Sequence, residues 1–374
     1  MDVLITIIGF QPCPDDRCFM ILVVGDDWVM LGVHVDDLPM ISNNKELLSH
    51  VILIIYKHFD LGVVDMPMKE VLGASIQHHE ALNGNITTSL NNSSKINKLI
   101  RSTGLQDLDP VYTPFPSKSK GGRITYEPPI NNQTVADLEI RLPYKKIVGS
   151  LVNIAIIRPD IAVAVSQLGG KRNNPNENDY ALLIHVIGYL KTTIKFERHF
   201  EKSLTPQELS ESYGDATYNS EPNGKSRIAA CHFVLGNLVE VTSKSKMTSS
   251  SNAGEIIATS NCCNDAIYIR RVARWAMKKL DNTYPTLDTP IPIYTDNSGA
   301  FKLSKPEHTT TKKTRHLDPK FFMVKDYQAR GIVDVRQIPG GSSDIQKADF
   351  FTKHFGVTHF TRKTRGMGIY DPTA

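Results

Sequence analysis

Short apolar runs alternate with polar residues near the start of the chain and then give way to a helical pattern. Positions 29–41 hold two apolar runs separated by Asp36 and Asp37, which predicts a β-hairpin with the acidic pair at its tip. From 45 to 59 the apolar residues recur at helical spacing, and a second amphipathic helix is predicted at 94–101. We therefore expect a small strand-and-helix unit in this part of the chain.

The middle of the chain predicts a loop followed by helices. Positions 109–129 are rich in Pro, Gly, Ser and Lys, which is typical of a long loop. A helical pattern at 144–168 is expected to break at Arg158-Pro159, because proline lacks an amide donor and restricts the residue before it. The next helix is predicted at 180–190.

After a polar connection at about 204–208 the pattern changes to short strands. Three are predicted at 213–218, 227–235 and 238–243, the last two joined by a turn at Gly236-Asn237. They are followed in order by a long helix at 253–280, a strand at 291–295, helices at 298–303 and 319–329, a strand at 332–338 and a final helix from about 343. Antiparallel strands followed by alternating helices and strands predict a mixed α+β fold, with a mixed α/β sheet in this unit.

Composition narrows the class of protein. A chain of 374 residues, at roughly 100–200 residues per domain, suggests two or three units. The chain is 40% hydrophobic and 22% charged, as in an ordinary globular protein, and its strongest apolar run, 51–56, is too short to span a membrane. Positions 1–10 lack the basic start and the cleavage site of a secretory signal. We expect an intracellular protein without a membrane partner, and the sequence does not distinguish cytoplasm from nucleus.

Cysteine content and net charge give little evidence for any particular function. The five cysteines are an odd number without repeated CxxC spacing, so neither a disulfide framework nor a zinc site is indicated. A net charge of +4 is weak evidence for nucleic-acid binding. Two clusters of basic residues could bind nucleic acid, but a solvated helix face explains either cluster at least as well. The first cluster is Arg270, Arg271, Arg274, Lys278 and Lys279, and the second is Lys312, Lys313, Arg315 and His316.

Four carboxylates occupy separate predicted elements of the last unit. Asp215 lies on its first strand and Glu255 near the start of the long helix, while Asp296 ends the fourth strand and Asp349 lies on the final helix. Such elements can bring four carboxylates to one edge of a sheet. Oxygen ligands suit Mg²⁺ or Mn²⁺, and two ions about 3.5–4 Å apart can hydrolyse a phosphodiester.

The sequences around these carboxylates resemble the RNase H domain of copia-type retrotransposons. The similar segments are SYGDATY, SKSKMTSSSNAGEIIA, IYTDNSGAFKLSKPEHTTTKKTRHLDPKFFMVKD and KADFFTKHF. The resemblance implies that Asp215, Glu255, Asp296 and Asp349 bind two Mg²⁺ or Mn²⁺ ions. The family often places two glutamates in the helix segment, and Ala253 stands at the first position. We choose Glu255, at the second, and expect a small residue after it to let the helix approach the sheet.

The upstream part resembles the same polyprotein, through short segments that occur in the family's order. They are Gly9-Phe10, Cys18-Phe19, HVDDL at 34–38, Leu72-Gly73, TPF at 113–115, YKKIVGSLVNIAIIRPDIAVAVSQL from Tyr144 and GYLKTT at 188–193. The resemblance implies a truncated reverse-transcriptase palm at 1–85, a thumb and connection region at 86–203 and an RNase H-like domain at 204–374.

In a reverse transcriptase, paired aspartates such as Asp36 and Asp37 bind the Mg²⁺ ions of the polymerase. Two features depart from the family's pattern: His34 replaces the usual aromatic residue, and Pro39 follows shortly after. Only 35 residues precede Asp36, so the third polymerase carboxylate and the fingers are not included. We expect no polymerase activity from this fragment.

The leading functional hypothesis is a nuclease that cleaves the RNA strand of an RNA–DNA hybrid, with nucleic acid and the rest of a retrotransposon polyprotein as partners. A catalytically inactive relic that only binds nucleic acid is the alternative. An integrase-like nuclease is disfavoured because such enzymes use three acidic residues, whereas a fourth, Asp349, is present here on a terminal helix. A serine hydrolase is disfavoured because positions 249–251 have no base and acid partners nearby. His308 and His316 could contact phosphate or assist product release, but a surface or packed histidine is the commoner outcome.

Overall fold

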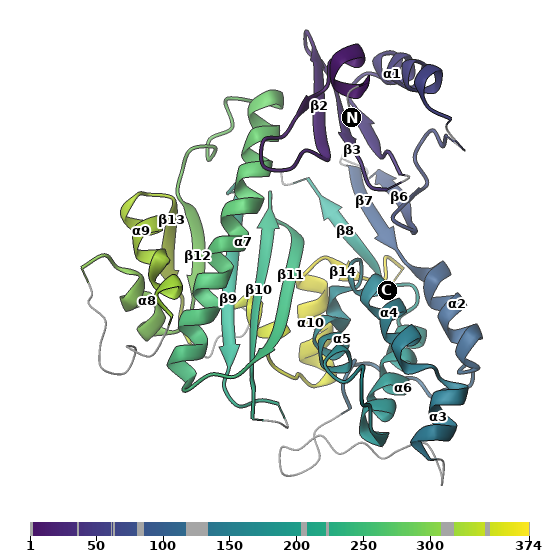
Figure 1. Ribbon diagram of the computed structural model, residues 1–374, viewed down its shortest axis with the longest axis vertical. Coiled ribbons are helices and arrows are strands. Elements are labelled where there is room, and N and C mark those ends of the chain that lie inside the picture. The colour runs from purple at the N-terminus through teal and green to yellow at the C-terminus, as the bar shows by residue number, and fades with distance from the viewer. Residues whose placement is uncertain are drawn as a thin grey trace.

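The computed structural model describes residues 3–35, 37–60, 62, 64–80, 86–116, 134–202, 208–221, 224–307, 318–340 and 345–373. Within these ranges, helices and three β-sheets form a mixed α+β protein, as the sequence predicts (Figure 1). In the part of the chain thus described, no helix combines the length and the apolar character needed to cross a bilayer.

The N-terminal unit is a four-stranded antiparallel sheet packed against two helices. Its strands, in spatial order, are β1 (Gln11–Pro12), β2 (Phe19–Val24), β3 (Asp27–Gly32) and β4 (Met40–Ser42). The helices are η1 (Val3–Ile8), a π-helix, and α1 (Lys45–His58), whose apolar face packs on the sheet through Val51 and Ile55. Met30 pairs with Ile41, and His34 bridges to Asp37 at the turn, so the predicted hairpin is confirmed with Asp37 at its tip.

A second sheet joins segments that lie far apart in the sequence. Its spatial order is β14 (Ile369–Tyr370), β8 (Glu197–Glu201), β7 (Ile86–Asn91), β6 (Ala74–Glu80) and β5 (Glu70–Val71), all antiparallel. Strands β6 and β7 thus pair across the predicted boundary at 85/86, and the last strand of the chain returns to pair with β8. The pairing of β8 with β7 and with β14 was not predicted, because these partners lie far apart in the sequence, whereas β5, β6 and β7 pair with their neighbours along the chain.

Helices form the middle of the chain: α2 (Ser93–Thr103), α3 (Val135–Arg141), α4 (Tyr144–Ala155), η2 (Pro159–Ile161), α5 (Ala162–Gly169) and α6 (Glu177–Thr192). The predicted break at Pro159 is confirmed. The fully buried guanidinium of Arg158 donates to both carboxylate oxygens of Asp160, at 3.0 and 2.7 Å, and to the carbonyl of Thr193 at 2.9 Å. These bonds link the break to the end of α6 and compensate the buried charge.

A five-stranded mixed sheet forms the C-terminal unit, in the order β11 (Asn237–Lys246), β10 (Ser226–Val234), β9 (Ser210–Thr217), β12 (Ile291–Thr295) and β13 (Val333–Gln337). Strands β9 to β11 are antiparallel, and β12 and β13 run parallel to β9. One turn differs from the prediction. Leu235 and Gly236, not Gly236 and Asn237, are its central residues, because both have positive φ angles and Val234 pairs with Asn237.

The long helix α7 (Ser251–Leu280) covers one face of this sheet and runs toward β2 (Figure 1). Its close approach depends on glycine: a Cβ on Gly214 would lie 3.2 Å from Cβ of Cys262. The other face of the sheet shares a hydrophobic core with the middle helices, in which Tyr213 and Phe233 pack with Leu151 and Leu168. The segments on either side of the predicted boundary at 203/204 therefore share one core.

The last part of the chain differs from the predicted final helix. A short 3₁₀ turn, η4 (Lys347–Phe351), is followed by α10 (Val357–Gly366) and then β14. Residues 341–344 lie outside the described ranges, so the predicted start at 343 is not described. The remaining elements beside β12 and β13 are α8 (Ser298–Ser304), η3 (Pro319–Phe322) and α9 (Met323–Ala329), close to their predicted positions.

The N-terminal unit contacts the far end of α7. Phe19 meets Trp275 edge to face with ring centroids 5.8 Å apart, Arg271 lies 3.5 Å from Asp15, and Lys279 donates to Gln11 at 2.7 Å. The other three basic residues of the predicted helix cluster bond within the C-terminal unit: Arg270 to the carbonyls of Thr286, Leu287 and Thr289, and Arg274 and Lys278 to Asp288. The α7 cluster is therefore used for internal contacts.

Candidate metal centre

Three of the four predicted carboxylates meet at one end of the five-stranded sheet. One ligand atom from each of Asp215, Glu255 and Asp296 can be chosen such that all lie within 4.8 Å of one another. Asp215 is 1% exposed and Glu255 6% exposed, while Asp296 is half-buried. In the described part of the chain, no other group of three ligand-type side chains meets this condition. We call these three residues the acidic triad.

Strand register and helix caps bring the triad together. Strands β9 and β12 pair at Ser212 and Tyr213, so that Asp215 and Asp296 lie beyond the last paired positions, at the carboxyl ends of two parallel strands. Open α/β sheets commonly bind ligands at such ends. Ser250 caps α7 by accepting a hydrogen bond from the amide of Ala253 at 3.1 Å, which starts the helix one turn before Glu255.

Small residues let Glu255 come close to Asp215. A Cβ on Gly254 would lie only 3.3 Å from Cβ of Ala216, the residue after Asp215. The small residue that permits this contact therefore precedes Glu255, whereas we expected it to follow; the following residue is Ile256, which packs in the core. Ala253, the alternative glutamate position, is a buried core residue.

Asp349 lies beside the acidic triad but outside it. It sits on η4, which is held against β9 by a 3.0 Å hydrogen bond from Gln346 Nε2 to the carbonyl of Gly214. The hydroxyl of Thr352 donates to Oδ2 of Asp215, and Lys353 Nζ lies 2.5 Å from Asp349 Oδ1. Neither Thr352 nor Lys353 was among the predicted site residues, although both follow Asp349 within one helical turn.

Burial and mutual repulsion raise the pKa values of two triad members, Asp215 and Glu255. Burial raises the pKa of Asp215 to about 6; Lys353 and the Thr352 hydroxyl oppose this rise, and the charge of Asp349 adds to it. Burial also raises the pKa of Glu255 to about 9, with the charges of Asp215 and Asp296 acting in the same direction. A bound divalent cation would reverse both shifts, because it stabilises the ionised carboxylates.

One orphaned atom tests whether these residues fit a metal. Oε2 of Glu255 is buried and finds no hydrogen-bond partner among the residues that the structure describes. A buried carboxylate oxygen without a partner is costly, whereas an ion held between three carboxylates would satisfy it. The all-oxygen donor set suits Mg²⁺ or Mn²⁺ without being specific for one of them.

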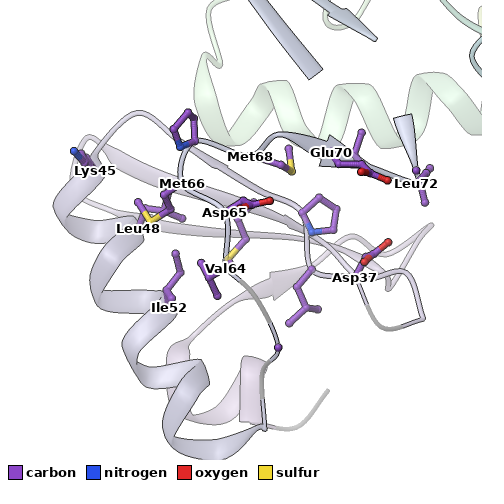
Figure 2. Close-up of a pocket in the computed structure, with 17 residues that line it drawn as sticks. Asp37, Lys45, Leu48, Ile52, Val64, Asp65, Met66, Met68, Glu70 and Leu72 are labelled. Atoms are coloured by element: carbon purple, nitrogen blue, oxygen red, sulfur yellow. The ribbon is translucent and has the colours of Figure 1, made fainter. Parts of the chain in front are cut away.

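The second predicted site is only partly described. Asp36 lies outside the described residues, and Asp37 lines a cavity of about 660 Å³ between α1 and the segment leading to β5 (Figure 2). Its walls are largely apolar, and include Met40, Ile52 and Met66. Asp37 belongs to no described group of three ligand-type side chains. His308, His316 and the basic cluster at 312–316 also lie outside the described residues.

Comparison with known proteins gives a family context. The retrovirus-related Pol polyprotein from transposon RE1 of Arabidopsis thaliana is 24% identical over 375 residues, which cover 97% of this chain. That from transposon TNT 1-94 of Nicotiana tabacum is 22% identical over 334 residues, or 88% of this chain. The chain is a homologue of copia-type retrotransposon Pol polyproteins. The predicted resemblance is thereby confirmed.

The chain corresponds to part of a Pol polyprotein, since it spans 23% of the length of each of these two relatives. An uncharacterized mitochondrial protein of Arabidopsis thaliana is 25% identical over 230 residues, which cover 60% of this chain and 87% of that protein. No family model and no solved structure matches the chain.

Proposed function

We propose that this Pol segment contains a metal-dependent nuclease that cleaves the RNA strand of an RNA–DNA hybrid. The observation that carries the proposal is the acidic triad, in which three carboxylates meet within 4.8 Å and a buried oxygen of Glu255 has no described partner. Their order along the chain and the motifs around them resemble a retrotransposon RNase H. Discrimination of the hybrid would rest on the 2′-hydroxyls of its RNA strand.

The proposed centre combines four metal ligands with one supporting hydroxyl group. Asp215, Glu255, Asp296 and Asp349 would hold two Mg²⁺ or Mn²⁺ ions, and such a pair activates a water molecule and stabilises the leaving oxygen of a phosphodiester. The Thr352 hydroxyl orients Asp215 and leaves its Oδ1 atom for an ion. Burial of Asp215 and Glu255 excludes water from the inner side of the centre.

The proposal includes the predicted three-part organisation. Residues 204–374 would form the RNase H-like domain, 86–203 the thumb and connection region, and 1–85 a reverse-transcriptase palm remnant with Asp36 and Asp37 as its carboxylate pair. The β-hairpin that carries Asp37 supports the last assignment. The core shared by the middle helices and the five-stranded sheet implies that the second and third parts act as one body.

The test is cleavage of a hybrid whose RNA strand is labelled, with Mg²⁺ or Mn²⁺ and then with excess chelator. We expect metal-dependent cleavage that is lost in Asp215→Asn. Asp334→Asn is the matched control, because Asp334 lies on β13 of the same sheet, half-exposed and paired with Arg336 away from the triad. Hybrid binding without cleavage by the parent protein would instead support the inactive relic.

A further inference from the structure

The carboxylates of the metal centre share one close ammonium group. Lys353 follows Asp349 by one turn, its amide donates to the Asp349 carbonyl at 3.0 Å, and its Nζ lies 2.5 Å from Asp349 Oδ1. The side chain of Asp349 is only 6% exposed and that of Lys353 40% exposed. The ion pair is therefore partly shielded from solvent, where charges act more strongly than at an open surface.

The charge of Lys353 reaches beyond Asp349. It lowers the pKa of both Asp215 and Glu255, opposing the larger effect of burial. Burial disfavours the ammonium itself, but Asp215, Asp349 and Asp296 outweigh it and raise the pKa of Lys353. One cation from the chain thus interacts with all four carboxylates of the proposed centre.

The four carboxylates are not equally available to ions. Asp215, Glu255 and Asp296 have ligand atoms within 4.8 Å of one another, and no ion pair with a basic side chain is found for them among the described residues. Asp349 lies outside this group and already binds an ammonium. A divalent cation bound by Asp349 would lie beside Lys353, so it must either displace the ammonium or bind against its repulsion.

We propose that Lys353 is a built-in competitor for the ion that Asp349 helps to bind, so that the centre loads its two ions in sequence. The acidic triad takes the first ion, and the second binds more weakly because it competes with Lys353. The inference rests on the proposed function for the presence of two ions. It adds that the affinity for the second ion, and so the metal concentration that the enzyme needs, is set by a lysine that is not itself a ligand.

Mn²⁺ titration of the full chain, followed by calorimetry and by the electron paramagnetic resonance of free Mn²⁺, tests this without substrate. We expect two binding constants in the parent protein. Lys353→Met should tighten the weaker constant by on the order of tenfold or more, since one unit charge beside the site is removed. Lys353→Arg, which keeps the charge, should preserve the gap between the constants, and Asp349→Asn should lose the weaker ion alone.

Lys347→Met is the matched control. Lys347 lies on η4, and its substitution changes the net charge by the same amount as Lys353→Met. Its ammonium group, however, pairs with Glu211 at 2.8 Å. It should leave both Mn²⁺ constants unchanged. Thermal unfolding adds a second readout: with chelator, Lys353→Met should unfold at a lower temperature than the parent, and saturating Mn²⁺ should remove that difference, whereas a deficit in Lys347→Met should persist.

The outcomes separate the two proposals. Two ions with unchanged constants in Lys353→Met would overturn the competitor role while leaving the nuclease proposal in place. A single ion in both proteins would overturn the competitor role together with the two-ion centre on which it rests. Failure of the parent protein to bind Mn²⁺ at all would overturn both.

Discussion

The hydroxyl of Thr352 donates a hydrogen bond to Oδ2 of Asp215, linking the turn η4 to the central strand β9 across the metal centre. Both side chains are buried, so no water replaces the hydroxyl when it is removed. The bond lowers the pKa of Asp215 against the stronger effect of burial. Thr352 therefore helps to keep the buried aspartate ionised and oriented.

Thr352→Val should weaken hybrid cleavage at neutral pH by about 10- to 100-fold, as loss of a residue that orients a metal ligand commonly does. Because the pKa of Asp215 would rise further, the pH of half-maximal activity should also move upward. A pH–rate profile measures both effects. Thr364→Val is the control, since that buried hydroxyl bonds the carbonyl of Phe360 at 2.8 Å, away from the triad. An unshifted profile in Thr352→Val would contradict the assigned role.

The carboxylates should differ in their importance for cleavage. Asp296→Asn removes a member of the acidic triad and should reduce cleavage by more than about 100-fold, beyond the range for residues that only support a ligand. Asp349→Asn should cost less, because Asp349 lies outside the triad and is paired with Lys353. Single-turnover cleavage rates at saturating Mg²⁺ give the comparison. Equal losses in the two variants would show that the triad is not the dominant ion site.

Stability without metal should fall as pH rises. Asp215 and Glu255 have pKa values of about 6 and about 9, above the ordinary 3.8 and 4.5, so the folded state binds more protons than the unfolded state in between. The free energy of unfolding contributed by these groups is therefore lost as pH rises from about 4 toward about 9. Mg²⁺ binds the ionised carboxylates, which are more abundant at pH 8 than at pH 5. Mg²⁺ should therefore stabilise the protein more at pH 8 than at pH 5.

Unfolding temperatures measured across this pH range, with chelator and with Mg²⁺, check the prediction. Glu255→Gln removes the group with the larger shift and should flatten the decline seen with chelator. The same slope in Glu255→Gln and the parent would show that Glu255 does not carry the effect.

Close packing of α7 on β9 gives a prediction about folding stability. Gly214→Ala places a Cβ 3.2 Å from Cβ of Cys262 and 3.3 Å from the carbonyl oxygen of Ala258, so we expect destabilisation by about 1–3 kcal/mol. Gly149→Ala is the matched control: its Cβ would meet nothing within 4 Å on α4, and it should stabilise by about 0.4–1 kcal/mol. Denaturant unfolding distinguishes the two signs, and a neutral Gly214→Ala would mean that the helix can move away from the sheet.

Local patterns in the sequence predict the C-terminal sheet well. The period of apolar residues gives β9 to β13 and α7 close to their observed bounds, and Pro159 gives the break between α4 and α5. The convergence of Asp215, Glu255 and Asp296 follows from this order. The carboxyl ends of the parallel strands β9 and β12 lie at the same edge of the sheet, and the first turn of α7 packs beside them.

Features that depend on distant contacts could not be predicted in the same way. The pairing of β8 with β7 and β14 has no local signal. The basic residues on α7 are typical of a solvated face or a nucleic-acid surface, but their partners are carbonyls and acidic residues of the segment that follows α7 and of the N-terminal unit. Thr352 and Lys353 acquire their roles only when η4 is placed against β9.

The pairing of Ile369 with Arg198 also bears on how the chain is made. During synthesis, β8 is complete long before β14, and until then one edge of β8 has unpaired amide and carbonyl groups. Open strand edges invite pairing with other chains, and non-local closure is slow. A ribosome that stops shortly before residue 369 would therefore release a protein whose metal centre can form but whose sheet edge remains open to aggregation.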